Sequence, residues 1–464
     1  MGFSSAIFLF AFLPLVFLAS RLPLSLRAQN LLLAAASLVF YAFGQLRCLP
    51  LFLLSVLINY LAGLLLCTSC RRSRPVLILA LVLNLGLLGL FKYADFAVQN
   101  LNALGAALPL PGLVLPIGIS FYTFQGLSYV IDCYRDPEGG TRSFLKLLLY
   151  LSFFPQLIAG PIVKYHDFAP QIDSRRQDLE STERGWRRFI RGLAKKLLIA
   201  DALGAAVDPI FSGAALGDGR LAWLGAVCYL FQIYYDFSGY SDMAIGMAEM
   251  FGFRLRENFL HPYAAADLRD FWRRWHVSLS GWFKEYLYIP LGGSRRGRLR
   301  AAGNRLLVFF CTGLWHGANW TFVVWGLGHG LLTALEGLLP WQRLQKHAAG
   351  RLICRGLMLL AVTLLFVVFR AESLAAAGRM LALLFSGTVS AAGGLMLMRL
   401  LSPARLLVLL VAGLCAGTLP EKLSARLGSE GLRPLGQLGC VVLLALSLLS
   451  LAKGGFQPFI YFQF

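Results

Sequence analysis

Apolar runs long enough to cross a lipid bilayer recur along almost the whole chain. Crossing about 30 Å of hydrocarbon takes roughly 20 mostly apolar residues in a helix. Of the 464 residues, 58% are hydrophobic and only 14% are charged, whereas about a quarter are charged in soluble globular proteins. The sequence therefore predicts an all-α polytopic membrane protein with about ten to twelve transmembrane helices. The expected spans are residues 7–19, 30–43, 51–66, 76–91, 145–158, 222–233, 306–314, 322–335, 357–369, 406–414 and 441–451.

The net charge of +20 would suggest nucleic-acid binding in a soluble chain, but the basic residues lie in the connections between apolar runs. Arg21 and Arg27 follow the first run, a single arginine follows the second, and Arg71, Arg72 and Arg74 follow the third. Because cytoplasmic loops carry the excess of Lys and Arg, this pattern predicts an N-terminus outside the cytoplasm. We expect the lipid bilayer as a partner, and no nucleic acid.

The nine cysteines are scattered, mostly within apolar stretches, where a thiol behaves as a small hydrophobic group. We expect no disulfide framework. Cys67 and Cys70 form one CxxC pair without a second pair or a histidine cluster, so we expect no metal site. No repeat of fixed period and no disordered linker interrupts the chain, which predicts one membrane domain over residues 1–464.

Two apolar segments contain residues that a simple lipid-facing helix avoids. The segment 115–132 carries a proline, two glycines and Gln125, and the segment "FFPQLIAGPI" carries two prolines around Gly160. Irregular backbone at membrane depth must pack against protein or line a cavity, because its polar groups find no partner in lipid. We therefore expect a kinked or re-entrant helix at 115–132 and a bend with freed carbonyl groups in the second segment.

Residues 266–288 combine an apolar stripe of helical period with basic residues off that stripe. This pattern predicts an amphipathic helix lying in the headgroup plane, in which Asp270 pairs with Arg274 four residues later. His276 sits at the border of the stripe, where an interfacial polar residue satisfied by phosphate or backbone is the simpler interpretation. The stripe consists of Leu268, Phe271, Trp272, Trp275, Leu279, Trp282, Phe283 and Tyr286.

His316 lies in the middle of "FFCTGLWHGANWTFVVWGLGHGLL", which contains no Lys, Arg, Asp or Glu. An ionisable residue inside a span points to a functional site, and a desolvated neutral imidazole can take a proton from a hydroxyl. The alternative is a buried hydrogen bond between helices, which is the simpler interpretation for His329. Glycines four residues apart bracket each histidine and predict close helix packing.

The run "YYDFSGYSDMAIG" places acids and hydroxyls directly after an apolar stretch. They either line a polar cavity or mark a helix terminus that a serine caps. Candidates for lining the cavity or binding substrate are Asp236, Ser238, Tyr240, Asp242, Trp272, Arg273, Trp315 and Asn319.

Five motifs in order carry a family resemblance: "LPIGISFYTFQGLSYVIDCY", "FFPQLIAGPIVKYHDF", "YYDFSGYSDMAIG", "FWRRWHVSLSGWFKEYLYIPLGG" and "GLWHGANW". Together they resemble the bacterial alginate O-acetylation branch of the membrane-bound O-acyltransferases. The resemblance covers a core of about residues 51–335. Hydropathy alone predicts the transmembrane helices that follow at about 352–452, before an aromatic tail at 455–464. The resemblance implies a helical bundle with re-entrant and interfacial helices around a central funnel or tunnel, with His316 and His276 as catalytic residues.

The same resemblance implies a reaction, a location and partners. An acyl thioester such as acetyl-CoA donates acetyl from the cytoplasmic side of the bacterial inner membrane, with no permanently bound cofactor and no metal. The acceptor is an exported polysaccharide, reached directly or through an exported acetyltransferase-like or esterase-like partner. The C-terminal "PFIYFQF" is similar to an aromatic motif of related systems, which makes Tyr461 a candidate acyl relay; interfacial anchoring of the tail is the alternative.

Two other functions remain open on the sequence. A transporter would place the histidines and Asp236 along a permeation path, but we find no inverted repeats or paired broken helices. A D-alanyl, lipid or protein acyltransferase of the same fold is the second alternative. The arginine-rich "WRRWH" and "YIPLGGSRRG" favour the polysaccharide branch by resemblance only.

Overall fold

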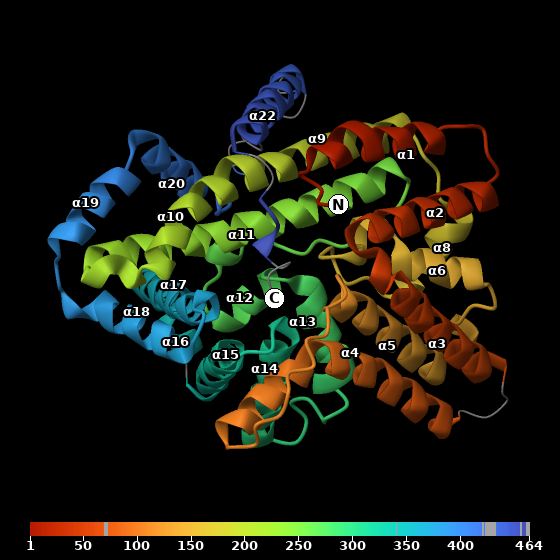
Figure 1. Cartoon of the computed structure of the whole chain (residues 1–464), viewed down its shortest axis with the longest axis horizontal. Coiled ribbons are helices and arrows are strands. Elements are labelled where there is room, and N and C mark those ends of the chain that lie inside the picture. Colours follow the sequence, from red (N-terminus) through yellow and green to blue (C-terminus); the bar gives the residue numbers. More distant parts are fainter. Residues whose placement is uncertain (69–72, 340, 420–421, 423–432, 455–456, 461–464) are drawn as a thin grey trace. The chain divides into compact units, whose positions relative to one another are not determined.

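The computed structural model describes residues 1–68, 73–339, 341–419, 422, 433–454 and 457–460, and these residues form helices without a β-strand (Figure 1). They group into two compact units, Met1–Phe189 with Tyr240–Arg256, and Ile190–Gly239 with Glu257–Phe464. The expectation was one membrane domain. Helices α9 (Leu179–Ala194) and α11 (Gly219–Met250) each run from one unit into the other, so no linker separates the units at these two places.

The helices of the first unit are α1 (Leu13–Ser20), α2 (Leu26–Gln45), α3 (Leu49–Thr68), α4 (Arg74–Ala103), α5 (Ile119–Arg135), α6 (Phe144–Ser152), α7 (Phe154–Leu157) and α8 (Tyr165–Ser174). Those of the second unit are α10 (Asp201–Ser212), α12 (Leu268–Arg274), α13 (Val277–Phe283), α14 (Arg298–His316), α15 (Trp320–Leu338), α16 (Trp341–Leu344), α17 (Ala348–Arg370), α18 (Leu374–Ser386), α19 (Ala391–Leu400), α20 (Pro403–Cys415) and α22 (Arg433–Gly454).

The described helices confirm an all-α polytopic membrane protein. Four stretches within the described residues are long and apolar enough to cross a bilayer, and the pair α18 and α19, bent by 92°, would make a fifth. Fewer spans meet this criterion than the ten to twelve expected, because several apolar runs form short helices or are interrupted by polar residues. The four are Leu26–Cys67, Arg74–Ala103, Ala348–Arg370 and Leu435–Gly454.

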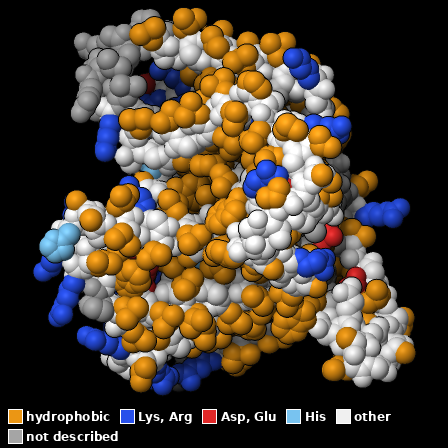
Figure 2. All heavy atoms as spheres, turned by 90° about the vertical axis from the view of Figure 1, so that its left-hand side faces the viewer, with side chains coloured by type: hydrophobic (Ala, Val, Ile, Leu, Met, Phe, Trp, Pro, Cys, Tyr) orange, Lys and Arg blue, Asp and Glu red, His pale blue; other side chains and the backbone are white. Residues whose placement is uncertain are grey.

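The outer surface has the composition expected of protein in lipid. Only 6% of the most apolar stretch within Leu435–Gly454 of α22 is buried inside the protein, and α17 exposes Leu352 and Ile353. Figure 2 shows hydrophobic side chains over most of the face that it draws, with basic side chains scattered among them. Contiguous exposed apolar surface of this extent is unfavourable in water and fits contact with lipid.

Within the first unit, the structure corrects one of the two expected irregular segments. Residues 119–135 form one helix, α5, which begins after Gly118 in a left-handed conformation (φ 75°). Gly126 lies inside this helix because a Cβ there would collide with the Asn59 side chain at 2.5 Å. The segment is buried against protein as expected, with Gln125 fully buried, but we find the break at its start.

The second irregular segment is confirmed. α7 ends at Leu157, and residues 158–163 continue without helical structure although they are buried. Backbone carbonyl groups in and next to this region accept hydrogen bonds from side chains. The Tyr150 hydroxyl donates to the Val163 carbonyl oxygen at 2.8 Å, and the Gln156 side-chain amide donates to the backbone carbonyl oxygen of Tyr150 at 2.7 Å. Buried irregular backbone is thereby satisfied by protein, as the bilayer requires.

Within the second unit, α14 and α15 form a tightly packed pair joined by only three residues (Figure 1). A Cβ on Gly313 would lie 2.3 Å from the Phe322 carbonyl oxygen, and one on Gly326 would lie 2.3 Å from the Phe309 carbonyl oxygen. The prediction that these glycines allow close helix packing is confirmed. The pairing fixes the position of His316, the last residue of α14.

Candidate active site

The prediction of one amphipathic helix in the headgroup plane at 266–288 is wrong, because the apolar stripe and His276 are buried within the protein and the segment does not form one helix. α12 ends at Arg274, Trp275 is extended, and α13 begins at Val277. Between them His276 adopts a left-handed conformation with φ 44° and ψ 54°, which non-glycine residues seldom adopt and which often marks functional sites. The helix is therefore broken at the histidine. The predicted ion pair between Asp270 and Arg274 is present at 2.9 Å.

Asn258 holds the turn at His276 through both its backbone and its side chain. The Val277 N–H donates to the Asn258 carbonyl oxygen at 2.9 Å. The side-chain oxygen of Asn258 accepts from the Ser278 N–H at 3.3 Å and from the Ser278 hydroxyl at 2.9 Å. The same oxygen lies 3.1 Å from Nδ1 of His276. These contacts fix the turn that breaks the helix.

The hydrogen bonds of Asn258 also assign the tautomer of His276. The Asn258 side-chain atom that accepts the Ser278 backbone N–H is the amide oxygen, because the amide nitrogen can only donate. This oxygen carries no hydrogen, so in its contact with His276 the hydrogen must lie on Nδ1. In a neutral imidazole the lone pair then lies on Nε2. His276 is 1% exposed, and its Nε2 makes no hydrogen bond to a described residue. This geometry presents a buried nitrogen that can accept a proton.

Trp315 and His316 follow each other at the end of α14, and the Trp315 ring links the two histidines. Its centroid lies 5.9 Å from that of His276 and 5.0 Å from that of His316. The His316 ring also packs edge-on against Trp325 at 5.0 Å and Phe369 at 5.3 Å. His316 is 4% exposed, so aromatic rings hold a nearly dry imidazole at the helix end.

His329 continues this aromatic cluster on α15. Its ring centroid lies 5.1 Å from that of Trp325, and its Nδ1 accepts the indole N–H of Trp272 at 3.3 Å. Trp272 is thus part of the core beside His329. A buried hydrogen bond between helices, the simpler interpretation of His329, agrees with this geometry.

Asp236 lies in the interior of α11 rather than at a helix terminus. Its Oδ1 pairs with Lys196 at 2.7 Å, and Lys196 also pairs with Asp201 at 2.7 Å. Asp236 and Lys196 are 1% and 4% exposed. Ser238 is buried two residues further along the same helix. The capping alternative for this region is wrong, because α11 continues to Met250.

The remaining predicted site residues have other surroundings. Tyr240 and Asp242 belong to the first unit, where Tyr240 stacks on Phe3 at 4.5 Å and Asp242 pairs with Arg188 at 3.0 Å. Asn319 caps α15 by accepting from the Thr321 N–H. Arg273 has an exposed side chain, and Tyr461 lies outside the described residues.

Two residues of this region were missed by reasoning from the sequence. Lys196 stands in the basic run "RGLAKK", which looked like an ordinary charged connection, and Asn258 stands in a long loop without a recognisable motif. The available signal for Lys196 was its place at the edge of an apolar run, 40 residues before Asp236, an aspartate in another apolar stretch. Among the described residues, no group of three or more His, Cys, Asp or Glu could hold a metal ion.

Comparison with known proteins agrees with this architecture. The sequence model of the membrane-bound O-acyltransferase family matches residues 43–374. A probable alginate O-acetylase of Pseudomonas putida is 38% identical over the full length of both chains. A probable alginate O-acetylase of Pseudomonas aeruginosa is 43% identical, covering 83% of this chain and 75% of the relative.

A peptidoglycan O-acetyltransferase of Helicobacter pylori is 39% identical, covering 82% of this chain and 79% of the relative. The residues matched by the family model include positions 276 and 316. The polytopic helical fold and these similarities lead to one assignment. The chain is a multi-pass membrane protein that belongs to the membrane-bound O-acyltransferase family.

Proposed function

We propose that this O-acyltransferase takes an acetyl group from a cytoplasmic thioester, acetyl-CoA or a close analogue, and transfers it for O-acetylation of an exported polysaccharide. The relatives named above act, by their names, on alginate and on peptidoglycan. The observation that carries the proposal is the pair His316 and His276, both buried and both packed on Trp315. Two buried imidazoles that contact the same tryptophan ring suit proton transfer from a hydroxyl.

In the proposed mechanism, His316 acts as the general base. It takes the proton of the acceptor hydroxyl while the hydroxyl oxygen attacks the thioester carbonyl carbon. The C–O bond forms, the C–S bond breaks, and the departing thiolate receives the proton from the imidazolium. The rings of Trp325 and Phe369 keep water from the imidazole, which limits hydrolysis of the thioester.

His276 has the supporting role in this mechanism. Asn258 orients its ring and holds the hydrogen on Nδ1, so Nε2 can accept a hydrogen bond from the substrate or assist a proton transfer. The left-handed backbone places His276 at the junction between α12 and α13. A side chain without a ring nitrogen at this place would lose both functions.

The proposal includes the location and partners of the enzyme. We place it in the bacterial inner membrane with the N-terminus outside, on the support of the arginines that follow the first and third apolar runs. The donor then enters from the cytoplasm. An exported acetyltransferase-like or esterase-like protein takes over the acetyl group or presents the polysaccharide on the other side.

Isolated membranes provide the experiment. Inverted membrane vesicles from cells with and without this protein receive acetyl-CoA labelled in the acetyl group, and alkali-labile label in the polysaccharide fraction is counted. The proposal predicts label only where the protein is present. Label in the lipid or protein fraction instead would favour the acyltransferase alternatives, and label after supply of a D-alanine thioester but not of acetyl-CoA would favour D-alanyl transfer. Absence of transfer from either donor would contradict the proposal.

A further inference from the structure

A buried ion cluster in the second unit leaves one carboxylate oxygen for another partner. Lys196 bridges Asp201 and Asp236, so two acids share one base. The second oxygen of Asp236 accepts the backbone N–H of Ile460 at 2.8 Å. A buried carboxylate needs hydrogen-bond donors on both oxygens, and here the second donor comes from the C-terminal segment 224 residues away.

Further contacts hold the same segment. The Lys196 ammonium group donates to the Pro458 carbonyl oxygen at 3.4 Å. The side chains of Phe459 and Ile460 are 3% and 8% exposed. The preceding helix α22 is fastened to the same turn of the chain, because the Ser450 hydroxyl donates to the Leu197 carbonyl oxygen at 3.2 Å. Residues 458–460 are therefore docked on the protein, with Phe459 and Ile460 buried and Pro458 exposed.

The docked segment reaches the surroundings of His276 through one ring. Phe237 follows Asp236 in α11, and its centroid lies 5.7 Å from that of Phe459. Phe237 also packs edge-on against His276, with 4.6 Å between the ring centroids. Removing the segment would leave Phe237 without this neighbour and loosen the packing of the imidazole, because closely packed interiors transmit such displacements.

We infer that Lys196 and Asp236 are positioning residues for acyl transfer, which dock residues 458–460 against Phe237 and thereby fix the ring of His276. The inference rests on the proposed function for its catalytic part and on the contacts alone for the docking. A buried ion cluster seldom adds net stability over apolar packing. In this protein the ion cluster orients the C-terminal segment, because Asp236 and Lys196 each form a hydrogen bond with the backbone of residues 458–460.

Two variants separate the docking from the integrity of the ion cluster. Asp236→Ala removes the acceptor, and Ile460→Pro removes the N–H donor while Lys196, Asp201 and Asp236 stay in place. Ile460→Val keeps the N–H and is the control for the second variant. Hydrogen exchange of the C-terminal peptide measures docking, and initial rates with labelled acetyl-CoA measure transfer per folded molecule.

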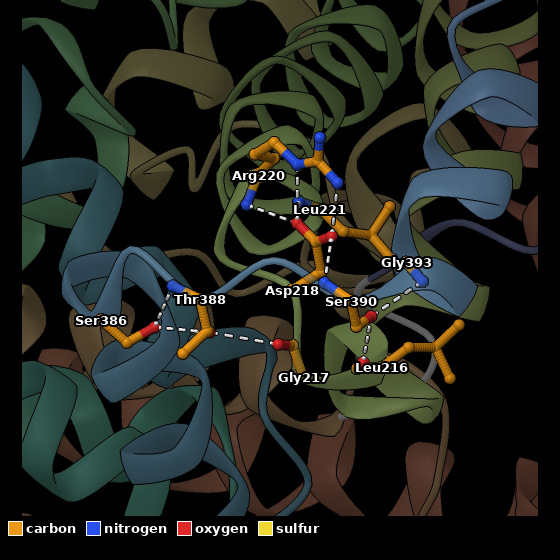
Figure 3. A network of polar contacts seen from close by, with 9 residues as sticks. All are labelled: Leu216, Gly217, Asp218, Arg220, Leu221, Ser386, Thr388, Ser390 and Gly393. Carbon is orange, nitrogen blue, oxygen red and sulfur yellow. Dashed lines mark hydrogen bonds and ion pairs between the residues drawn. The ribbon is translucent and has the colours of Figure 1, made fainter.

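The control for losing a buried aspartate is Asp218→Ala. Asp218 is also buried and immediately precedes α11. It accepts hydrogen bonds from Arg220, Leu221 and Ser390, which tie the start of α11 to the loop between α18 and α19 (Figure 3). None of these hydrogen bonds involves the C-terminal segment. Asp218→Ala therefore removes a buried carboxylate next to the start of α11 without undocking residues 458–460.

We expect Asp236→Ala to raise exchange of the Ile460 amide at least tenfold. Asp236→Ala and Ile460→Pro should each lower kcat about tenfold, with KM for acetyl-CoA within twofold. The kcat of the double variant should be no lower than that of either single variant, because both substitutions break the same hydrogen bond between Ile460 and Asp236. Asp218→Ala and Ile460→Val should leave exchange and kcat unchanged.

Unchanged exchange in Asp236→Ala would overturn the docking, and raised exchange with unchanged kcat would overturn the positioning role. Multiplying losses in the double variant would also contradict it. Failure of the proposed function would show separately, as a wild-type protein that transfers no acetyl although its C-terminal amides are protected. In that case the docking stands and the catalytic part of the inference falls.

Discussion

A methyl group at Gly326 perturbs the contact between α14 and α15 by steric overlap alone, without adding or removing a hydrogen-bonding group. The added Cβ would lie 2.3 Å from the Phe309 carbonyl oxygen and 3.1 Å from the backbone of Gly313. These are backbone atoms, so the helices must separate by roughly 0.7 Å to reach even 3.0 Å. Because His316 ends α14 and Trp325 precedes the substituted glycine, the imidazole moves relative to the indole. A misplacement of about 1 Å costs about 100-fold in rate.

The assay for Gly326→Ala is acetyl transfer in membranes with matched protein levels, together with thermal unfolding in detergent. We expect a loss of about 100-fold in rate and of about 1–3 kcal/mol in stability. Gly303→Ala on α14 is the control, because its Cβ would meet nothing within 4 Å; its rate should equal that of the wild type. A rate for Gly326→Ala within twofold of the wild type would refute the argument that this contact positions His316.

Three further substitutions test other parts of the structure. Asn258→Leu removes the acceptor that orients His276, so acetyl transfer should fall about 10- to 100-fold; a normal rate in membranes would contradict the assigned orientation. Asp218→Ala leaves the buried Leu221 N–H and partly buried donors of Arg220 and Ser390 without their acceptor. It should cost about 1–3 kcal/mol in thermal unfolding, with transfer per folded molecule unchanged; a loss of specific rate would contradict its structural role. His329→Phe leaves the indole N–H of Trp272 without its acceptor, so it should lower the unfolding temperature but reduce transfer less than loss of His316 does, and an equal loss would make His329 part of the chemistry.

Local patterns in the sequence predicted the features that depend on neighbouring residues. The glycines around His316 predicted close packing of α14 and α15, since small residues four apart share a helix face. The prolines and glycine after Phe154 predicted a buried irregular segment, because they cannot continue a helix. Asp270 and Arg274 pair because residues four apart in a helix are neighbours. Each of these rules needs only a few consecutive residues.

Features that depend on distant contacts could not be predicted in this way. The periodicity of residues 266–288 continues through His276, and only the hydrogen bonds from Asn258 reveal why the helix breaks there. Neighbouring residues do not predict the burial of Lys196, because its ion pair is with Asp236, 40 residues away in the chain. The number of spans was also hard to predict: fewer described stretches meet the length and hydropathy of a lipid-facing span than the ten to twelve expected, because a buried helix needs neither that length nor uniform hydropathy.

The most direct test of the central claim compares the O-acetyl content of exported polysaccharide in cells that carry the wild type or His316→Ala at equal membrane levels. The account predicts that acetylation disappears while the variant stays folded, as judged by size-exclusion behaviour in detergent. Unchanged acetyl content with a folded His316→Ala protein would contradict His316 as the base and reopen the transporter and structural interpretations of this histidine.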